Sequence, residues 1–168
     1  MSTLSTDLKV SLAFDFKTSI RGVQGRFNPQ FIHSGRYADG AAVNQSNMLW
    51  YDNTPRSLGA TTDDDIDLSG IQTTPYGSTI LFTIIKGMFV QNLSEVVGDE
   101  LTIGGAASFP FLLFDDATDV FTLGPGGVFF FDEPSLAGKP VTAGTGDILR
   151  IGNAGANAIT YNIAIWGV

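Results

Sequence analysis

The stretch Lys9-Val10-Ser11-Leu12-Ala13-Phe14-Asp15-Phe16 decides the fold class of this protein. Its even positions are apolar, and its odd positions are polar or small. Successive side chains of a β-strand point to opposite faces, so this period of two predicts a strand with one apolar and one solvated face. Similar short runs recur along the chain between Gly, Pro, Asn and Asp residues, and none has the period of a helix. The sequence therefore predicts an all-β protein.

The first strand is placed over residues 8–17, and the same pattern locates the others. They are expected over 47–51, 65–70, 79–92, 100–104, 120–123, 128–131, 146–151 and 159–166. Gly87 within the longest run indicates a bulge or kink, and residues 111–114 are either a further strand or a packed loop. About eight strands with uneven loops favour a two-sheet jelly-roll sandwich over an up-and-down barrel. A Greek-key sandwich with fewer strands is the alternative.

The chain of 168 residues fits one domain. Residues 18–45 have no clear period and contain several glycines, which predicts a long irregular connection with a short extended piece at 31–32. We therefore expect residues 1–45 to supply the first strand and an extended contact segment. Residues 46–168 are expected to supply the remainder of the same domain.

Composition excludes several classes of partner. Charged residues make up 15% of the chain, below the usual ~25%, which predicts that part of the surface is covered in an oligomer or a larger assembly. The net charge is -8, and the nine basic residues are scattered, so no cluster is available to bind nucleic acid. Cysteine is absent, which excludes disulfides and thiolate chemistry.

Neither end of the chain nor its interior carries a membrane signal. The first seven residues lack the basic start and apolar core of a signal peptide. The longest apolar run, 80–85, stops at Lys86, far short of the ~20 residues that a membrane helix requires. We expect a soluble protein that is synthesised in a cytoplasm and contacts no membrane.

Residues that catalysis usually needs are scarce. His33 is the single histidine, and no nucleophile-elbow motif accompanies it. The Gly-rich turn at 124–127 is similar to the turns of cupin metal enzymes, but their sites need several histidines. We therefore expect no enzymatic activity and no cofactor.

Two acidic clusters and a few aromatic residues leave other kinds of site to consider. The acidic clusters, 63–67 and 115–119, lack the Gly and distal Glu of a calcium-binding EF-hand loop, and we interpret them as solvated turns and strand starts. Paired carboxylates are also used in glycoside hydrolysis, but acidic β-proteins contain such pairs by chance. Aromatic side chains that could stack on sugars are more often part of a core; these are Trp50, Tyr51, Tyr76 and Trp166.

A succession of short motifs begins at residue 49. It comprises Leu49-Trp50-Tyr51-Asp52, Asp65-Ile66-Asp67-Leu68-Ser69-Gly70, Gly124-Pro125-Gly126-Gly127 and Val141-Thr142-Ala143-Gly144-Thr145-Gly146-Asp147-Ile148-Leu149-Arg150-Ile151. This succession, over residues 45–168, resembles small virion structural proteins of tailed bacteriophages, of the capsid decoration or cement kind. The resemblance implies an eight-stranded jelly roll, often trimeric, on the capsid exterior, with no catalytic residues.

The function that this resemblance implies is mechanical. A cement protein binds the outer capsid surface and stabilises contacts between subunits of the major capsid protein. Such a protein is synthesised in the cytoplasm of the host bacterium, and it has the major capsid protein and further copies of itself, as a homotrimer, for partners. A tail- or fibre-associated virion protein that binds host glycans is the alternative.

The segment 18–45 is the expected place of contact with the shell. It holds three of the nine basic residues of an acidic chain, together with several aromatic residues. Arg and aromatic side chains are enriched at interface hot spots. The expected contact residues are Arg21, Arg26, Phe27, Phe31, His33, Arg36 and Tyr37. The alternative is that they cover one end of the sandwich.

The fold class can be checked in solution. Because every expected element is a strand, a far-ultraviolet circular dichroism spectrum of the purified protein should lack a substantial helical signal. A spectrum dominated by helix would contradict the all-β prediction.

Overall fold

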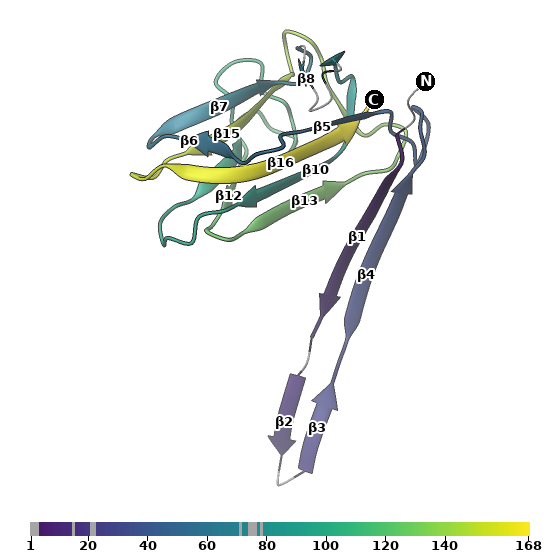
Figure 1. Ribbon diagram of the computed structural model, residues 1–168, viewed down its shortest axis with the longest axis vertical. Coiled ribbons are helices and arrows are strands. Elements are labelled where there is room, and N and C mark those ends of the chain that lie inside the picture. The colour runs from purple at the N-terminus through teal and green to yellow at the C-terminus, as the bar shows by residue number, and fades with distance from the viewer. Residues whose placement is uncertain (1–3, 15, 21–22, 71, 74–76, 78) are drawn as a thin grey trace.

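The computed structural model describes the chain apart from residues 1–3, 15, 21–22, 71, 74–76 and 78, and between 16 and 27 it describes the backbone alone. Every regular element among the described residues is a β-strand, so the all-β prediction is confirmed. Figure 1 shows two parts, a β-sandwich and a long hairpin that projects from one end of it.

The sandwich consists of two antiparallel sheets. Sheet I has the order β13 (Val128–Asp132), β10 (Ile84–Asn92), β16 (Ile159–Gly167) and β5 (Met48–Tyr51), with the short strands β14 (Lys139–Pro140) on β10 and β6 (Arg56–Leu58) on β16. Sheet II has the order β12 (Val120–Leu123), β11 (Leu101–Gly104), β15 (Ile148–Asn153) and β7 (Thr62–Asp67). A separate small pair joins β8 (Gln72–Thr73) to β9 (Thr79–Ile80).

The eight main strands pair from the outside of the chain inward. The first, β5, pairs with the last, β16, and β7 pairs with β15. In the same way β10 pairs with β13, and β11 pairs with β12. All four pairs are antiparallel, and they are divided between the two sheets. The sandwich part of the fold prediction is therefore confirmed.

The core lies between the two sheets. On β16 the residues Ile159, Tyr161, Ile163 and Ile165 are buried and alternate with less buried ones. They pack against buried residues of sheet II such as Leu149. Burial of apolar surface at roughly 25 cal/mol per Å² is the main favourable contribution to such a core. Residues 111–114, expected as a strand or a packed loop, form a loop whose Phe111 and Leu113 are buried.

An aromatic cluster closes the edge at which β12 and β13 lie. The ring centroids of Phe121 and Phe129 are 5.4 Å apart, and Phe114 lies 6.2 Å from Phe121 and 5.8 Å from Phe129. Such pairs contribute about 0.5–1.5 kcal/mol each beyond their buried area. The cluster therefore joins the outermost strands of the two sheets.

The N-terminal region departs from the prediction. Strand β1 (Thr6–Ala13) pairs with β4 (Gln30–Tyr37), and β2 (Phe16–Ile20) pairs with β3 (Val23–Phe27). We call β1 to β4 the arm; it lies outside the sandwich, whose strands begin at Met48. The prediction that 18–45 is irregular was wrong for β2, β3 and β4, but it is confirmed for 38–45, which contains no strand. Phe31 and Ile32 are adjacent on β4 and both exposed, because neither sheet covers this part of the arm and burial therefore imposes no period of two there.

Gly87 confirms the predicted irregularity in the longest strand, since the register of β10 against β16 shifts between Ile85 and Gly87. Gly87 lies directly opposite Trp166. A Cβ atom at position 87 would overlap with the indole ring of Trp166. The missing side chain therefore makes room for the tryptophan on the sheet.

Substitution of Gly87 tests this packing. We expect Gly87→Ala to lower the free energy of unfolding by about 1–3 kcal/mol, because the added methyl group overpacks the contact with Trp166. Urea denaturation followed by tryptophan fluorescence measures the change. Gly124→Ala is the matched control, because an added Cβ there meets no atom within 4 Å. Equal stability of the two variants would contradict the interpretation.

Candidate functional site: the hairpin arm and its root

The arm is a two-stranded ribbon. Its register runs from Thr6 opposite Tyr37 to Ala13 opposite Gln30. The Phe14 N–H then donates to the Pro29 carbonyl oxygen at 3.1 Å, and β2 and β3 continue the pairing (Figure 1). At about 3.3 Å per residue, the extended chain from the start of β1 at Thr6 to the end of β2 at Ile20 spans roughly 45 Å. An isolated two-stranded hairpin is at best marginally stable in water, so a partner surface would stabilise the arm.

The two faces of the arm differ in chemistry. Residues directly opposite each other in an antiparallel pair share a face. The inner face carries Thr6, Leu8, Val10, Leu12, Phe31, His33, Gly35 and Tyr37, and the outer face carries Asp7, Lys9, Ser11, Ala13, Gln30, Ile32, Ser34 and Arg36. The inner face is mainly apolar and the outer face mainly polar, so the two can serve different surfaces.

We call the end of the arm next to the sandwich, from the pair Thr6 and Tyr37 to the pair Val10 and His33, its root. The carboxylate of Asp132 holds this root. It lies at the end of β13, and its side chain is only 4% exposed. The Tyr37 hydroxyl donates a hydrogen bond to Asp132 Oδ1, and Nε2 of His33 lies 2.9 Å from Oδ2. Gly35 lies between these two residues on β4, and a Cβ there would come within 3.3 Å of Oδ2. Glycine at this position thus allows the carboxylate to approach the arm closely.

Burial and the bond to Asp132 also change the acidity of Tyr37. The side chain is 1% exposed. Burial, followed by the hydrogen bond to Asp132, raises the pKa of the Tyr37 phenol above its ordinary value. Both effects favour the neutral hydroxyl, which is the form that donates to the carboxylate.

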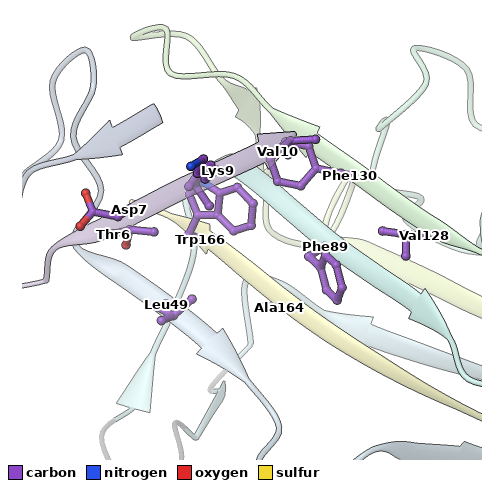
Figure 2. A pocket seen from close by; sticks show the side chains of 11 residues that line it. Thr6, Asp7, Lys9, Val10, Leu49, Phe89, Val128, Phe130, Ala164 and Trp166 are labelled. Atoms are coloured by element: carbon purple, nitrogen blue, oxygen red, sulfur yellow. The ribbon is translucent and has the colours of Figure 1, made fainter. Parts of the chain in front are cut away.

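A groove of about 390 Å³ lies between the arm and sheet I. Figure 2 shows Val10 on β1 near Phe130 and Trp166, with Phe89 and Val128 further along the sheet. The rings of Phe130 and Trp166 are 6.0 Å apart. Most of the side chains that line the groove are apolar, and Val128 at its edge is 51% exposed.

Sequence reasoning missed this groove, although β13 contained a signal. The run Val128-Phe129-Phe130-Phe131 is apolar at every position. A strand that is apolar on both faces is typically covered on both. Phe129 and Phe131 pack against the core, and Phe130 lines the groove on the opposite face.

The structure places the expected contact residues at different levels of the arm. Phe31, 63% exposed, lies on the inner face beyond the root. Arg36 lies on the outer face, 3.3 Å from Asp7, and both side chains are 77% exposed. The His33 side chain is 55% exposed but is held by Asp132. Arg26 and Phe27 belong to β3, and Arg21 lies outside the described residues.

Tyr37 requires a correction. It was expected to contact a partner, but it is buried inside the molecule and anchors the arm through Asp132. Part of the expected contact segment therefore covers the sandwich, as the alternative interpretation proposed. The part beyond the root remains exposed at Phe31 and Ile32.

For the two tryptophans, the interpretation as structural residues is confirmed and sugar stacking is not supported. Trp50 and Trp166 are 4% and 3% exposed, so neither offers a freely exposed ring for sugar stacking, and Trp166 lies at the bottom of the groove under the arm. Trp50 belongs to the core, and its ring lies 5.5 Å from the Arg56 guanidinium. Tyr76 lies outside the described residues.

The acidic residues at 63–65 are paired with arginine. Arg150 donates to both carboxylate oxygens of Asp65, at 2.7 and 2.8 Å, and lies 3.1 Å from Asp63. This guanidinium lowers the pKa of Asp65. Asp64 accepts hydrogen bonds from Arg56 at 2.6 Å and from Tyr161 at 2.5 Å. These carboxylates therefore contribute to the packing of β7 against β15 and β16.

In the part of the chain that the structure describes, no three His, Asp or Glu side chains are grouped so that they could hold a metal ion. The same part contains no helix long and apolar enough to span a membrane. Comparisons with protein-family models, with curated proteins and with solved structures found no match to this chain.

The anchoring role of Tyr37 can be tested by Tyr37→Phe. The variant loses a hydrogen bond to a buried carboxylate, so we expect a loss of about 1.5–3 kcal/mol of stability at neutral pH. Because folding raises the pKa of Tyr37, its contribution is complete below the unfolded pKa of about 10 and decreases as the pH rises above that value.

Urea denaturation followed by tryptophan fluorescence measures both effects. The stability difference between wild type and Tyr37→Phe should be constant below about pH 10 and shrink above it. Ser34→Ala, on the outer face of the arm, is the control and should change little. An unchanged difference at high pH would contradict the assignment.

Proposed function

We propose that this protein is a non-enzymatic structural component of a tailed-phage virion, a decoration or cement protein on the capsid exterior. Its arm binds the outer capsid surface, and the bound protein stabilises contacts between major capsid protein subunits. The observation that carries the proposal is a β-sandwich from which a long hairpin projects (Figure 1), and this hairpin has exposed apolar side chains.

The strand pairing supports the resemblance on which this proposal draws. We infer that the sandwich is a jelly roll, because its eight main strands pair first with last, second with seventh, third with sixth and fourth with fifth. A long hairpin rolled over two sheets produces this order. A jelly roll is the fold that the resemblance to decoration proteins implies.

The arm supports the binding role. Beyond the root, Leu12 is 54% exposed, Phe14 53%, Phe31 63% and Ile32 59%. Exposed apolar patches on a soluble protein usually mark an interaction surface. Each apolar contact contributes roughly 25 cal/mol per Å² before the costs of association. Many copies on one particle then act together through multivalency.

The function is tested with purified particles and an arm-shortened variant. Val10 and His33 lie opposite each other, so a two-residue Asn-Gly turn can join them and remove residues 11–32, which include all four of these exposed side chains, while the root is kept. We expect this variant to fold but to lose binding to particles that lack the protein. Particles with wild-type protein should resist heating better than particles with the variant.

A substitution in an exposed loop of the sandwich, Val97→Ser, serves as the control, because Val97 is 96% exposed and far from the arm in sequence. It should bind like wild type. A copy number comparable to that of the major capsid protein supports the proposal. A copy number typical of tail components would point to the tail- or fibre-associated alternative, and full binding by the shortened variant would overturn the role of the arm.

A further inference from the structure

We propose that the part of the arm's inner face beyond the root, formed by Leu12, Phe14 and Phe31, docks on the outer face of sheet I in a second copy of this chain. We call this part the distal half of the inner face. It fills the groove at the root of the second copy's arm. This inference concerns contact between identical chains, and it does not rest on the proposed function.

The inner face has the same chemistry along its length but is covered only near the root. Leu8 and Val10 line the groove over sheet I of their own chain, and Figure 2 shows Val10 above the sheet. Leu12 lies opposite Phe31 further out, and both are more than half exposed. The rings of Phe14 and Phe31 are 6.4 Å apart and meet edge to face at 80°. An ordered apolar unit is therefore exposed where the sheet no longer covers it.

The same chain cannot cover this unit with its own groove. Val10 and Leu12 are two residues apart on a continuous strand, so Leu12 lies about 7 Å further from the root. Because Leu8 and Val10 already form one wall of the groove, β1 cannot also turn back into it. The arm points away from the sandwich (Figure 1), so only another molecule can cover its distal half.

The distribution of charge points to a second copy as that molecule. Residues 6–37 contain five basic and two acidic residues, a net charge of +3, whereas residues 38–168 contain four basic and fifteen acidic residues, a net charge of -11. A basic arm and an acidic sandwich attract each other between copies, and such complementarity steers association.

The groove offers an apolar surface for this contact. It is lined by Phe89, Val128, Phe130 and Trp166 from sheet I, and Val128 at its edge is half exposed. The contact joins two different surfaces, the arm and the sheet. An assembly built from this contact is therefore closed when successive copies form a ring, or when each of two copies places its arm on the other.

The first test measures self-association of the full chain by sedimentation equilibrium. Wild type should have a mass of at least two times the 17.9 kDa of one chain. Leu12→Asp with Phe31→Asp should sediment as a monomer, because charges at the centre of an apolar contact weaken association by at least about 100-fold. Val128→Asp, at the edge of the groove that receives the arm, should also shift the protein toward the monomer.

Ile32→Asp is the matched control. Ile32 is as exposed as Phe31 and adjacent to it, but it lies on the outer face. The control should retain the wild-type mass. These positions are exposed within one chain, and a circular dichroism spectrum like that of wild type shows that each variant is folded.

The second test identifies the surfaces in contact. Because the chain has no cysteine, Phe31→Cys in one chain and Val128→Cys in a differently tagged chain can be co-expressed and treated with a short bismaleimide. A covalent pair carrying both tags is expected, and Ile32→Cys with Val128→Cys should give far less of it.

Several results would overturn the inference: a monomeric wild type at high concentration, an unchanged oligomer in the Leu12/Phe31 double variant, or equal cross-linking from both cysteine pairs. If wild type is monomeric and the Leu12/Phe31 double variant fails to bind particles, the distal half of the arm binds the capsid surface and not a second copy of this chain. That result would overturn docking between copies and leave the proposed function in place.

Discussion

The contact between Gly87 and Trp166 is the constraint on which the rest of the structure depends. The two residues lie opposite each other in the central strand pair of sheet I, and the indole occupies the space that a side chain at 87 would need. Trp166 thereby forms part of the outer face of the sheet, beside Phe130. The root of the arm crosses this surface (Figure 2). The packing of Gly87 against Trp166 therefore forms part of the surface on which the arm lies where it leaves the sandwich.

Apolar contact alone would not fix the direction of the arm, because it is not directional. The hydrogen bonds at Asp132 supply that direction. Tyr37 and His33 both reach the same carboxylate at the end of β13, and a buried carboxylate left without partners would be costly. The root therefore combines a buried polar anchor with an apolar groove, while the arm beyond it remains exposed. This division between a fixed root and an exposed end is the structural basis of the binding role that we propose for the arm.

The composition can now be interpreted in physical terms. A low content of charged residues led to the expectation of a partly covered surface, and the structure has two apolar surfaces that are candidates for it, the groove on sheet I and the distal half of the arm. They carry similar side chains and lie in regions of opposite net charge. A protein with both surfaces has the means to assemble, whichever partner uses the arm.

The sequence by itself determined the strands of the sandwich, since their alternation reflects burial on one face, as in Ile66 and Leu68, and the period of two follows from local backbone geometry. It also indicated the irregularity at Gly87. It did not determine which sheet a strand joins. The alternation of Val10 and Leu12 predicted a strand correctly, but their apolar face belongs to the arm and not to the core. The role of Tyr37 likewise depends on Asp132, which is 95 residues away. Only the tertiary structure decided these points, because a period of two shows that one face of a strand is apolar but does not show which distant segment pairs with the strand or covers that face.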